Sequence, residues 1–474
     1  MSRGCPGMSG KKYGKVDDEV LRRLIDELGK ENVKADLVER YAYSTDASLF
    51  SSLPDVVVTP KNTDQVVEVL RIASEKNIPI TPRGGGTGLC GGAVPLHGGI
   101  LVDLSGMNRI LEVDLDNLCV TVEAGITPEM LNKHLAKHGF FFPPSPGSKK
   151  MCTVGGMIAT NAGGMHAVKY GVTRNFVLGL KAVIPPGEVL SLGGKVLKRC
   201  LGYDLIQLII GSEGTLGIVT EATLRILPLP EKSAVVVAYF RDCSTAAKVV
   251  NAVLRRVIPS AIEVLDEKSI EAVNRYVPSL NLPQAGAALY FEIDGSEQEV
   301  EGQLKVIVDA CKMHGGETEW TSNPNEKERL LAGREIVGGA IMNIDKRRVR
   351  VYEAEDVCVP LAQLPHFIEE VHRISERYGI PVCIYGHAGD GNCHSGIMID
   401  PTSREEWEKM RMMSREIYEL AVKLGGNISG EHGIGLLRAE YMESIHGPSL
   451  RIMKEIKKAF DPQGILNPGK MSIS

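Results

Sequence analysis

Two kinds of hydrophobic pattern alternate through the first half of the chain. Apolar residues recur at helical spacing in DEVLRRLIDELG and again in residues 63–77, which predicts two amphipathic helices, the second with Thr63 as its N-cap. Short apolar runs such as PDVVVTP and IPITP predict buried strands. Further strands are expected in GGILVDLS, RILEVD and CVTVEAG, followed by a helix in TPEMLNKHLAKHG. Residues 141–175 are rich in Gly, Pro and Ser and contain no long periodic element.

The texture changes after Pro228 and Pro230, which mark a domain boundary. Strands such as AVVVAYF and ALYFEID then alternate with helices such as STAAKVVNAVLRRV and EQEVEGQLKVIVDACKMHG. We therefore predict an α+β chain with two domains, at residues 51–230 and 231–425. A helical N-terminal segment, residues 1–50, precedes them, and residues 426–474 follow as one helix and a tail that ends in Pro and Gly.

Composition excludes several classes of protein. With 43% apolar and 24% charged residues, the 474-residue chain resembles an ordinary globular protein and not a disordered one. Its net charge of −5 offers no basic stripe for phosphates, so nucleic acid is not an expected partner. The first residues have no apolar core and do not resemble a signal peptide. The longest uncharged stretch, residues 84–102, has eight glycines among 19 residues and predicts no transmembrane helix, so we expect a cytoplasmic protein.

The ten cysteines are scattered, and no two have C-x-x-C spacing. This argues against an iron–sulfur cluster or a cysteine-type zinc site in the chain. Scattered cysteines in a large chain without a signal peptide are expected to be reduced thiols that pack as small hydrophobic side chains.

The most distinctive local motif is a glycine loop, PRGGGTGLCGGAVP, at Pro82–Pro95. The pattern Gly86-x-Gly88-x-x-Gly91 matches the dinucleotide fingerprint, but that fingerprint needs a helix directly after the loop. Here the chain continues through Pro95 into a predicted strand. Consecutive glycines can instead turn several backbone N–H groups inward to form a nest for a diphosphate.

Two further glycine-rich segments lie in the same predicted domain. CTVGGMIATNAGG covers residues 152–164, and GSEGTLGIVTEATLRILP covers residues 211–228. Several such segments in one domain suggest one long ligand lying against the backbone.

Histidines and one glutamate form a second group of candidate residues. His387 and His394 flank a turn between two predicted strands, so a hairpin is expected to bring both imidazoles to one face. Glu431 and His432 follow in the glycine-framed SGEHGIG. Two imidazoles and one carboxylate leave open positions on a divalent cation, as a catalytic site requires. A single histidine is more often structural, and the spacing of the two is a weak motif by itself.

Several motifs, in order along the chain, resemble a known flavoprotein family. The three glycine-rich segments resemble the FAD-binding domain of the vanillyl-alcohol oxidase/p-cresol methylhydroxylase (PCMH) family. YGHAGDGNCH, SGEHGIG and FDPQGILNPGK are similar to its D-2-hydroxyacid dehydrogenase branch, which includes D-lactate dehydrogenases and the FAD subunit of glycolate oxidase. The resemblance covers residues 40–470. It implies a PCMH-type FAD-binding domain at 51–230, a ferredoxin-like α+β cap domain for the substrate at 231–425, and a C-terminal segment that packs on the FAD domain and completes an active site between the domains.

The resemblance also implies how the cofactor binds. The flavin diphosphate is expected on the glycine loop and the isoalloxazine near the second glycine cluster, without a covalent bond, because no His or Cys stands at a recognisable linkage position. The implied FAD-binding residues are Arg83, Gly84, Gly85, Gly86, Thr87, Gly88, Cys90, Gly91, Gly92, Ser148, Thr153, Gly155, Gly156, Ala159, Asn161, Gly163, Ile218 and Asn467.

The same resemblance assigns the catalytic group. His387, His394 and Glu431 match metal ligands for one divalent cation, which the N/O donors leave open between Zn, Fe and Mn. His432 matches the base that accepts the hydroxyl proton of the substrate, and Arg334 matches the arginine that binds its carboxylate.

The substrate class follows from one departure within this branch. Relatives that oxidise dicarboxylates carry a lysine just before the strand equivalent to EDVCVP, where this chain has Glu353 and Ala354. We therefore expect a small monocarboxylate (D-lactate, glycolate or a modestly larger 2-hydroxyacid), oxidised to the 2-oxoacid with hydride transfer to flavin N5. The chain departs from the family pattern at two more places: residues 144–148 replace the usual Pro-Asp-Pro, and residues 199–204 replace the usual Asn-Val-Ala-Gly-Tyr-Asp. The resemblance therefore leaves the flavin contacts at these two places open.

The same motifs leave two alternative functions open. One alternative is an oxidase of the same fold acting on a phenol or an alkyl-glycerone phosphate, and another is an electron-transfer or regulatory flavin subunit without its own substrate. Because the chain has no cysteine cluster for a second redox centre, we expect electrons to pass to a partner: an electron-transfer flavoprotein, an iron–sulfur subunit or a quinone-linked chain. Membrane contact is expected only through such partners, and the assembly is left open between a homodimer and a hetero-complex.

Overall fold

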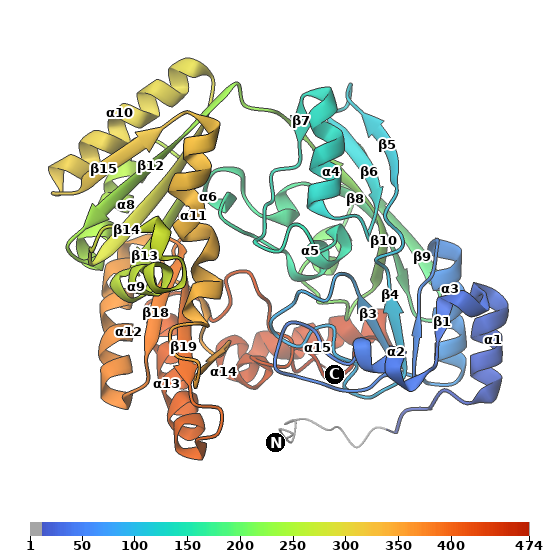
Figure 1. Ribbon diagram of the computed structural model, residues 1–474. Helices are drawn as coiled ribbons and strands as arrows, with labels where there is room; N and C mark the ends of the chain where they lie inside the picture. Colours follow the sequence, from blue (N-terminus) through green and yellow to red (C-terminus); the bar gives the residue numbers. More distant parts are fainter. Residues whose placement is uncertain (1–11, 474) are drawn as a thin grey trace. The chain divides into compact units, whose positions relative to one another are not determined.

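The computed structural model describes residues 12–473 and divides the chain into two compact units (Figure 1). The first unit has three stretches: residues up to Ala162, Val172–Leu229, and Glu431 onward. The second contains Pro230–Gly430 together with the short excursion Gly163–Gly171. The boundaries expected from sequence do not include this excursion, and residues 1–11, with Cys5, lie outside the described part of the chain.

A small, mostly parallel sheet begins the first unit. Its strands lie in the order β1 (Val33–Lys34), β2 (Val56–Val58), β4 (Ile100–Asp103), β3 (Ile80–Arg83). Helices α1 (Asp18–Leu28) and α3 (Thr63–Glu75) pack their apolar residues into the same core as these strands. The predicted N-cap of α3 is wrong: the Asn62 side chain accepts the Gln65 N–H, so the cap stands one residue before Thr63.

A five-stranded antiparallel sheet forms the second layer of the first unit. The order is β5 (Ile110–Asp114), β6 (Cys119–Glu123), β10 (Ile218–Arg225), β8 (Val177–Ile184), β9 (Glu188–Gly193). Strands β7 (Phe140–Phe141) and β11 (Leu227–Pro228) form a separate two-stranded sheet. The other helices of this unit are α2 (Leu37–Ala42), α4 (Pro128–Leu135), α5 (Val154–Thr160) and α7 (Leu205–Ile209).

The C-terminal segment is hydrogen-bonded into this first unit. It contains α14 (Met442–His446) and α15 (Pro448–Phe460), and its later part runs beside β3, where Ile80 and Leu466 form a bridge. The Asn467 N–H binds the Ile80 carbonyl at 2.7 Å, and the Leu436 N–H binds the Cys90 carbonyl at 2.7 Å. The described part of the stretch from Glu431 onward therefore contacts β3 and the glycine loop.

The second unit is built on one antiparallel sheet. Its order is β15 (Glu317–Thr321), β12 (Lys232–Phe240), β14 (Ala287–Gly295), β13 (Ala261–Asp266), β18 (Val382–His387), β19 (Asn392–Ile399), β16 (Val349–Val351), and β17 (Asp356–Cys358) also pairs with β19. Its helices are α6 (Ala167–Tyr170), α8 (Cys243–Leu254), α9 (Glu267–Tyr276), α10 (Glu297–Met313), α11 (Pro324–Ile341), α12 (Leu364–Tyr378) and α13 (Arg404–Lys423).

Helices cover this sheet on both faces. α8, α10 and α12 pack on one face, and α9 and α11 pack on the other (Figure 1). Alternate residues of a strand point to the same face, so Leu265, Cys383 and Met398 share the core under α9 and α11. By the same alternation, side chains two or four residues before or after these core positions also lie on this face. They include His387 of β18 and His394 of β19.

Candidate active site

The glycine loop after β3 packs directly against the second glycine cluster. A Cβ atom on Gly85 would lie 1.9 Å from the Met151 carbonyl oxygen, and one on Gly84 would lie 2.2 Å from Thr153 Oγ1. Gly86 has a φ of +66°, a backbone region that favours glycine. The two clusters therefore form one backbone surface that side chains at positions 84 and 85 would disrupt, and this surface fits a cofactor cradled by backbone groups.

Several predicted cofactor residues shape this surface through contacts within the protein. Arg83 donates to the Thr45 carbonyl at 2.6 Å, and the Cys90 thiol donates to the Gly433 carbonyl at 3.2 Å. Thr153 caps α5 by accepting the Gly156 N–H. Gly155 lies so close to Ala124 that a Cβ would come within 2.8 Å of its methyl group.

The remaining predicted cofactor residues lie around the same segments. Asn161 ends α5 with a φ of +51° and accepts the Arg174 N–H. Asn467 donates its side-chain amide to the Gly92 and Glu213 carbonyls at 3.0 and 2.8 Å. Other predicted residues are Thr87 and Gly88 within the loop, Gly91 and Gly92 at its end, Ser148 before α5, Ala159 within α5, Ile218 at the start of β10, and Gly163, which belongs to the excursion grouped with the second unit.

Sequence reasoning missed Glu213, a buried carboxylate in the third glycine-rich segment. Its two oxygens accept the N–H groups of Ile434 and Gly435 at 2.6 and 2.7 Å. Burial raises the pKa of Glu213 above its ordinary value, and these two hydrogen bonds oppose the rise. The residues that Glu213 holds directly follow His432 and Gly433, so the carboxylate fixes the path of the chain just after the predicted base.

In the second unit, the predicted hairpin of β18 and β19 is confirmed. His387 pairs with Asn392 and His394 pairs with Tyr385, so the two histidines lie diagonally on one face instead of directly opposite each other. Both are buried, and their ring centroids are 5.2 Å apart with the rings nearly perpendicular. Two imidazoles this close, on paired strands, form a suitable donor set for a transition-metal cation.

A buried glutamate on the neighbouring strand holds one of these histidines. Glu263 of β13 stands opposite His387, and its Oε1 lies 2.7 Å from His387 Nδ1. Its Oε2 accepts a hydrogen bond of 2.6 Å from Arg334 Nε, and Arg334 Nη2 also contacts this oxygen. Burial alone would raise the pKa of Glu263, but Arg334 and His387 outweigh it and hold the pKa below its ordinary value.

A second buried arginine and glutamate lie near His394. Glu355 Oε1 is 3.5 Å from His394 Nδ1 and forms an ion pair with Arg350. Arg350 also donates to the Tyr385 hydroxyl, and the guanidinium groups of Arg334 and Arg350 lie 5.4 and 5.2 Å from the Tyr385 ring centroid. Tyr385 therefore lies in contact with both arginine–glutamate pairs.

Glu431 and His432 lie at the start of the last stretch of the first unit. His432 Nε2 is 3.4 Å from Glu431 Oε1, and both side chains are partly buried. The carbonyl of the next residue, Gly433, accepts from Arg438 Nη1 at 2.9 Å. The predicted base is thus followed by a residue that is fixed through its carbonyl.

The sequence carried a usable signal for one of the missed glutamates. Glu263 interrupts the otherwise apolar strand AIEVL, and a buried charge at a core position normally has a specific partner. Its partner is 124 residues away, so the sequence does not name it. Glu213 offers only its position between glycines, which does not distinguish it from a loop residue.

Comparison with known families decides the class of this protein. Residues 229–471 match the model described as FAD linked oxidases, C-terminal domain, and residues 54–193 match the model described as FAD binding domain. The chain belongs to the FAD-linked oxidases. The predicted FAD-binding domain and the flavoprotein class are thereby confirmed, and this protein is an FAD-dependent oxidoreductase.

Two relatives show how far the similarity extends. This chain is 38% identical to the glycolate oxidase subunit GlcD of Bacillus subtilis, over 96% of this chain and 97% of that protein. It is 39% identical to the D-lactate dehydrogenase of Archaeoglobus fulgidus, over 88% of this chain and 91% of that protein. These are the two groups named by the sequence resemblance.

Solved structures confirm the two-domain PCMH-type fold. This chain superimposes on the 4-ethylphenol oxidase of Gulosibacter chungangensis with a TM-score of 0.80 at 19% identity, covering 97% of this chain and 98% of that one. For p-cresol methylhydroxylase the TM-score is 0.79 at 18% identity, with 96% of each chain covered. Within residues 12–473, no helix is both long and apolar enough to cross a membrane.

Proposed function

We propose that this protein oxidises a small D-2-hydroxyacid, D-lactate or glycolate, to the 2-oxoacid with bound FAD and one divalent cation. The observation that carries the proposal is the buried pair of His387 and His394, with ring centroids 5.2 Å apart on adjacent strands. Glu263 engages Nδ1 of His387, so Nε2 is the ring nitrogen that we propose binds the cation. Relatives at 38–39% identity that are named glycolate oxidase subunit and D-lactate dehydrogenase support the substrate class.

Glu431 is the third proposed ligand, and the chain path supports it. Glu431 directly follows Gly430, whose N–H binds the Asp356 carbonyl at 3.3 Å. Asp356 is the residue of β17 that pairs with His394. The residue before Glu431 is therefore hydrogen-bonded to β17, the strand whose Asp356 pairs with His394. Imidazole and carboxylate donors suit Zn, Fe and Mn alike, so the proposal does not choose among them.

The remaining roles belong to side chains of this chain. When bound, the cation would lower the pKa of the substrate hydroxyl and the flavin would accept the hydride at N5. His432 is the proposed base for the hydroxyl proton, because a neutral imidazole nitrogen can accept a proton. Arg334 is proposed to bind the substrate carboxylate through Nη1, since Nε and Nη2 contact Glu263.

A monocarboxylate substrate is proposed because this chain has Glu353 just before β17, where relatives that oxidise dicarboxylates have a lysine. Glu353 is 9% exposed, and Ala354 follows it with a φ of +51°. A second substrate carboxylate near Glu353 would meet a like charge in place of a lysine.

Electrons are proposed to leave to a partner: an electron-transfer flavoprotein, an iron–sulfur subunit or a quinone-linked chain. In the described part of the chain, the clusters of three or more side chains able to hold a metal contain only histidine and glutamate. The sequence has no C-x-x-C pair either, so we expect an iron–sulfur centre, where one takes part, to be supplied by the partner. Association with a membrane surface is proposed only through such a partner.

One experiment tests the proposed reaction. Purified holoprotein is mixed anaerobically with D-lactate, L-lactate, glycolate and D-2-hydroxyglutarate while flavin absorbance is followed. We expect D-lactate or glycolate to bleach the flavin, L-lactate and the dicarboxylate to do so far more slowly, and chelation to stop bleaching with flavin still bound. Flavin bleached by dithionite but by none of the acids would support a subunit without its own substrate. In air, hydrogen peroxide formed as fast as substrate is consumed would identify an oxidase and contradict the proposed partner.

A further inference from the structure

Glu263 is a buried carboxylate of the second unit, and both of its oxygens have partners. It is 1% exposed, and its two oxygens are divided between Arg334 and His387, as described above. A buried carboxylate is stable only when charges or donors compensate its lost hydration. Arg334 supplies the compensating charge. The contact with His387 is therefore not needed to stabilise the carboxylate, and it can serve to orient the imidazole.

We propose that Glu263 is a positioning residue that fixes the ring and the tautomer of His387 and thereby sets the protein's affinity for a divalent cation. The proposal rests on the proposed function in one respect, that His387 is a metal ligand. It adds a residue that touches neither cation nor substrate.

The tautomer follows from the chemistry of the pair. A carboxylate bonded to a guanidinium is ionised and only accepts hydrogen bonds, so the proton of the 2.7 Å contact lies on His387 Nδ1. The lone pair of the neutral ring is then on Nε2. Metal-binding imidazoles commonly donate their second N–H to a carboxylate, which orients the ring and makes it a stronger ligand.

The position of Glu263 also limits the movement of the ring. Glu263 and His387 are directly paired across β13 and β18, so the carboxylate and the imidazole are held by the same ladder. Arg334 lies on α11 one turn from Leu330 and Val337, which are buried in the core beneath that helix. Helix, carboxylate and ring thus form one continuous series of contacts.

The corresponding contact at His394 is weaker. Glu355 Oε1 lies 3.5 Å from His394 Nδ1, at the outer limit of a hydrogen bond. We therefore expect removal of the Glu263 carboxylate to weaken cation binding more than removal of the Glu355 carboxylate.

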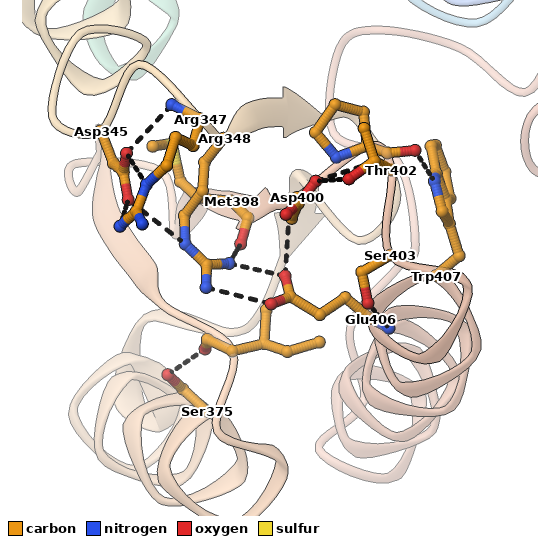
Figure 2. A network of polar contacts seen from close by, with 12 residues as sticks. Asp345, Arg347, Arg348, Ser375, Met398, Asp400, Thr402, Ser403, Glu406 and Trp407 are labelled. Carbon is orange, nitrogen blue, oxygen red and sulfur yellow. Dashed lines mark hydrogen bonds and ion pairs between the residues drawn. The ribbon is translucent and has the colours of Figure 1, made fainter.

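A matched control is available in the same unit. Figure 2 shows Glu406 accepting two hydrogen bonds from Arg348, at 2.6 and 3.1 Å, and one from the Asp400 N–H at 2.8 Å. Glu406 is therefore another arginine-paired glutamate, but its contacts include no histidine. The variant Glu406→Gln disturbs an ion pair of the same kind without touching His387.

The test measures cation affinity in the FAD-loaded protein. Apparent dissociation constants for Zn²⁺ and Mn²⁺ are determined by competition with a chromogenic chelator for the wild type, Glu263→Gln and Glu406→Gln. We expect Glu263→Gln to bind about 10- to 100-fold more weakly with its FAD content unchanged, and Glu406→Gln to bind within about threefold of the wild type. Wild-type affinity in Glu263→Gln, or an equal loss in both variants, would overturn the proposal.

A measurement on the wild type keeps the inference testable if Glu263→Gln does not fold. With histidine-selective ¹⁵N labelling and His387→Gln for assignment, metal-free protein should show the neutral His387 ring protonated at Nδ1, and a neutral ring protonated at Nε2 and not at Nδ1 would overturn the inference. A wild type without affinity for either cation would remove the proposed metal site as well, whereas an unchanged Glu263→Gln contradicts this inference alone.

Discussion

The carboxylate of Glu213 and the backbone N–H of Gly435 are joined by a hydrogen bond of 2.7 Å, although 222 residues separate them in sequence. The backbone N–H of Glu213 in turn binds the carbonyl of Ala159, in the helix formed by the second glycine cluster, at 2.8 Å. One residue therefore connects the proposed flavin surface with the loop that presents His432.

The variant Glu213→Gln should lower kcat more than it changes KM. The amide nitrogen of glutamine would face a backbone N–H that now has an acceptor, so the loop after His432 must shift. A shift of about 1 Å in a catalytic group can cost about 100-fold, and we expect a loss of about 10- to 100-fold in the rate of flavin reduction. Stopped-flow reduction with D-lactate and the FAD-to-protein ratio are measured on one preparation.

Glu123→Gln is the control for this variant. Glu123 is also buried in the first unit and accepts a backbone N–H, from Arg109, at 2.8 Å. Its replacement should reduce thermal stability without slowing flavin reduction. Equal slowing in both variants would mean that Glu213 contributes only to stability.

The stability difference between the wild type and Glu213→Gln should depend on pH. Because burial raises the pKa of Glu213, the folded state holds this proton more tightly than the unfolded state does. Ionisation therefore destabilises the wild type as pH rises above the unfolded value of about 4.3, and the glutamine variant lacks this effect. Melting temperatures between about pH 5 and pH 8 should shift in favour of the variant as pH rises.

Local patterns in the sequence were sufficient for the elements on which the site is built. The hairpin that carries His387 and His394 was expected from two apolar runs around a turn, and it is present. The glycine loop was expected to lead into a strand and not a helix, and β4 is the next element. Both features depend on short-range chemistry, which one sequence contains.

Features that depend on distant partners were missed or misplaced. Helix α5 has two glycines in seven residues, so its propensity is poor, and the Thr153 cap and the close packing of Gly155 on Ala124 hold it instead. The excursion Gly163–Gly171 groups with the second unit, and Lys169 in it donates to the Asp294 carbonyl at 2.8 Å. Glu263 and Glu213 likewise owe their roles to partners more than 100 residues away.

The variant Gly85→Ala should lose FAD. Its Cβ would lie 1.9 Å from the Met151 carbonyl oxygen, so the loop has to move away from the second glycine cluster. Overpacking of this kind costs about 1–3 kcal/mol, which corresponds to about 5- to 150-fold in FAD affinity if the bound loop bears the strain. The FAD-to-protein ratio after dialysis measures the effect, and acid precipitation should release all the flavin if it is noncovalent.

Gly194→Ala serves as the control for the loop variant. A Cβ at Gly194 meets no atom within 4 Å, so FAD content should stay at the wild-type value. Full FAD occupancy in Gly85→Ala would show that the glycine loop does not hold the cofactor.

Thiol labelling should single out one of the described cysteines. Cys200 is exposed, whereas burial raises the pKa of both Cys311 and Cys358 to about 12. At about pH 8 the thiolate fraction of a group with that pKa is about one part in ten thousand, so these thiols react slowly. The variant Cys200→Ser should remove one rapidly reacting thiol per chain in a titration of native protein with a disulfide reagent. No difference from the wild type would contradict the exposed position of Cys200.

The last prediction concerns His432, the proposed base. Its Nε2 lies 3.4 Å from Glu431 Oε1, and the carbonyl of Gly433 after it is held by Arg438 at 2.9 Å. Adjacent residues of an extended chain direct their side chains differently, so Glu431 and His432 can serve a cation and a substrate separately.

Loss of His432 should therefore remove proton transfer and leave both cofactors in place. We expect His432→Ala to be yellow and metal-loaded, with flavin reduction by D-lactate slowed by about 10²- to 10⁴-fold. His446→Ala, also in the first unit, is the control and should reduce its flavin normally. If His432 only orients Glu431, the alanine variant will lose metal together with activity, so metal content and the anaerobic reduction rate, measured on the same sample, separate the two roles. A metal-loaded His432→Ala that reduces its flavin at the wild-type rate would exclude His432 as the base.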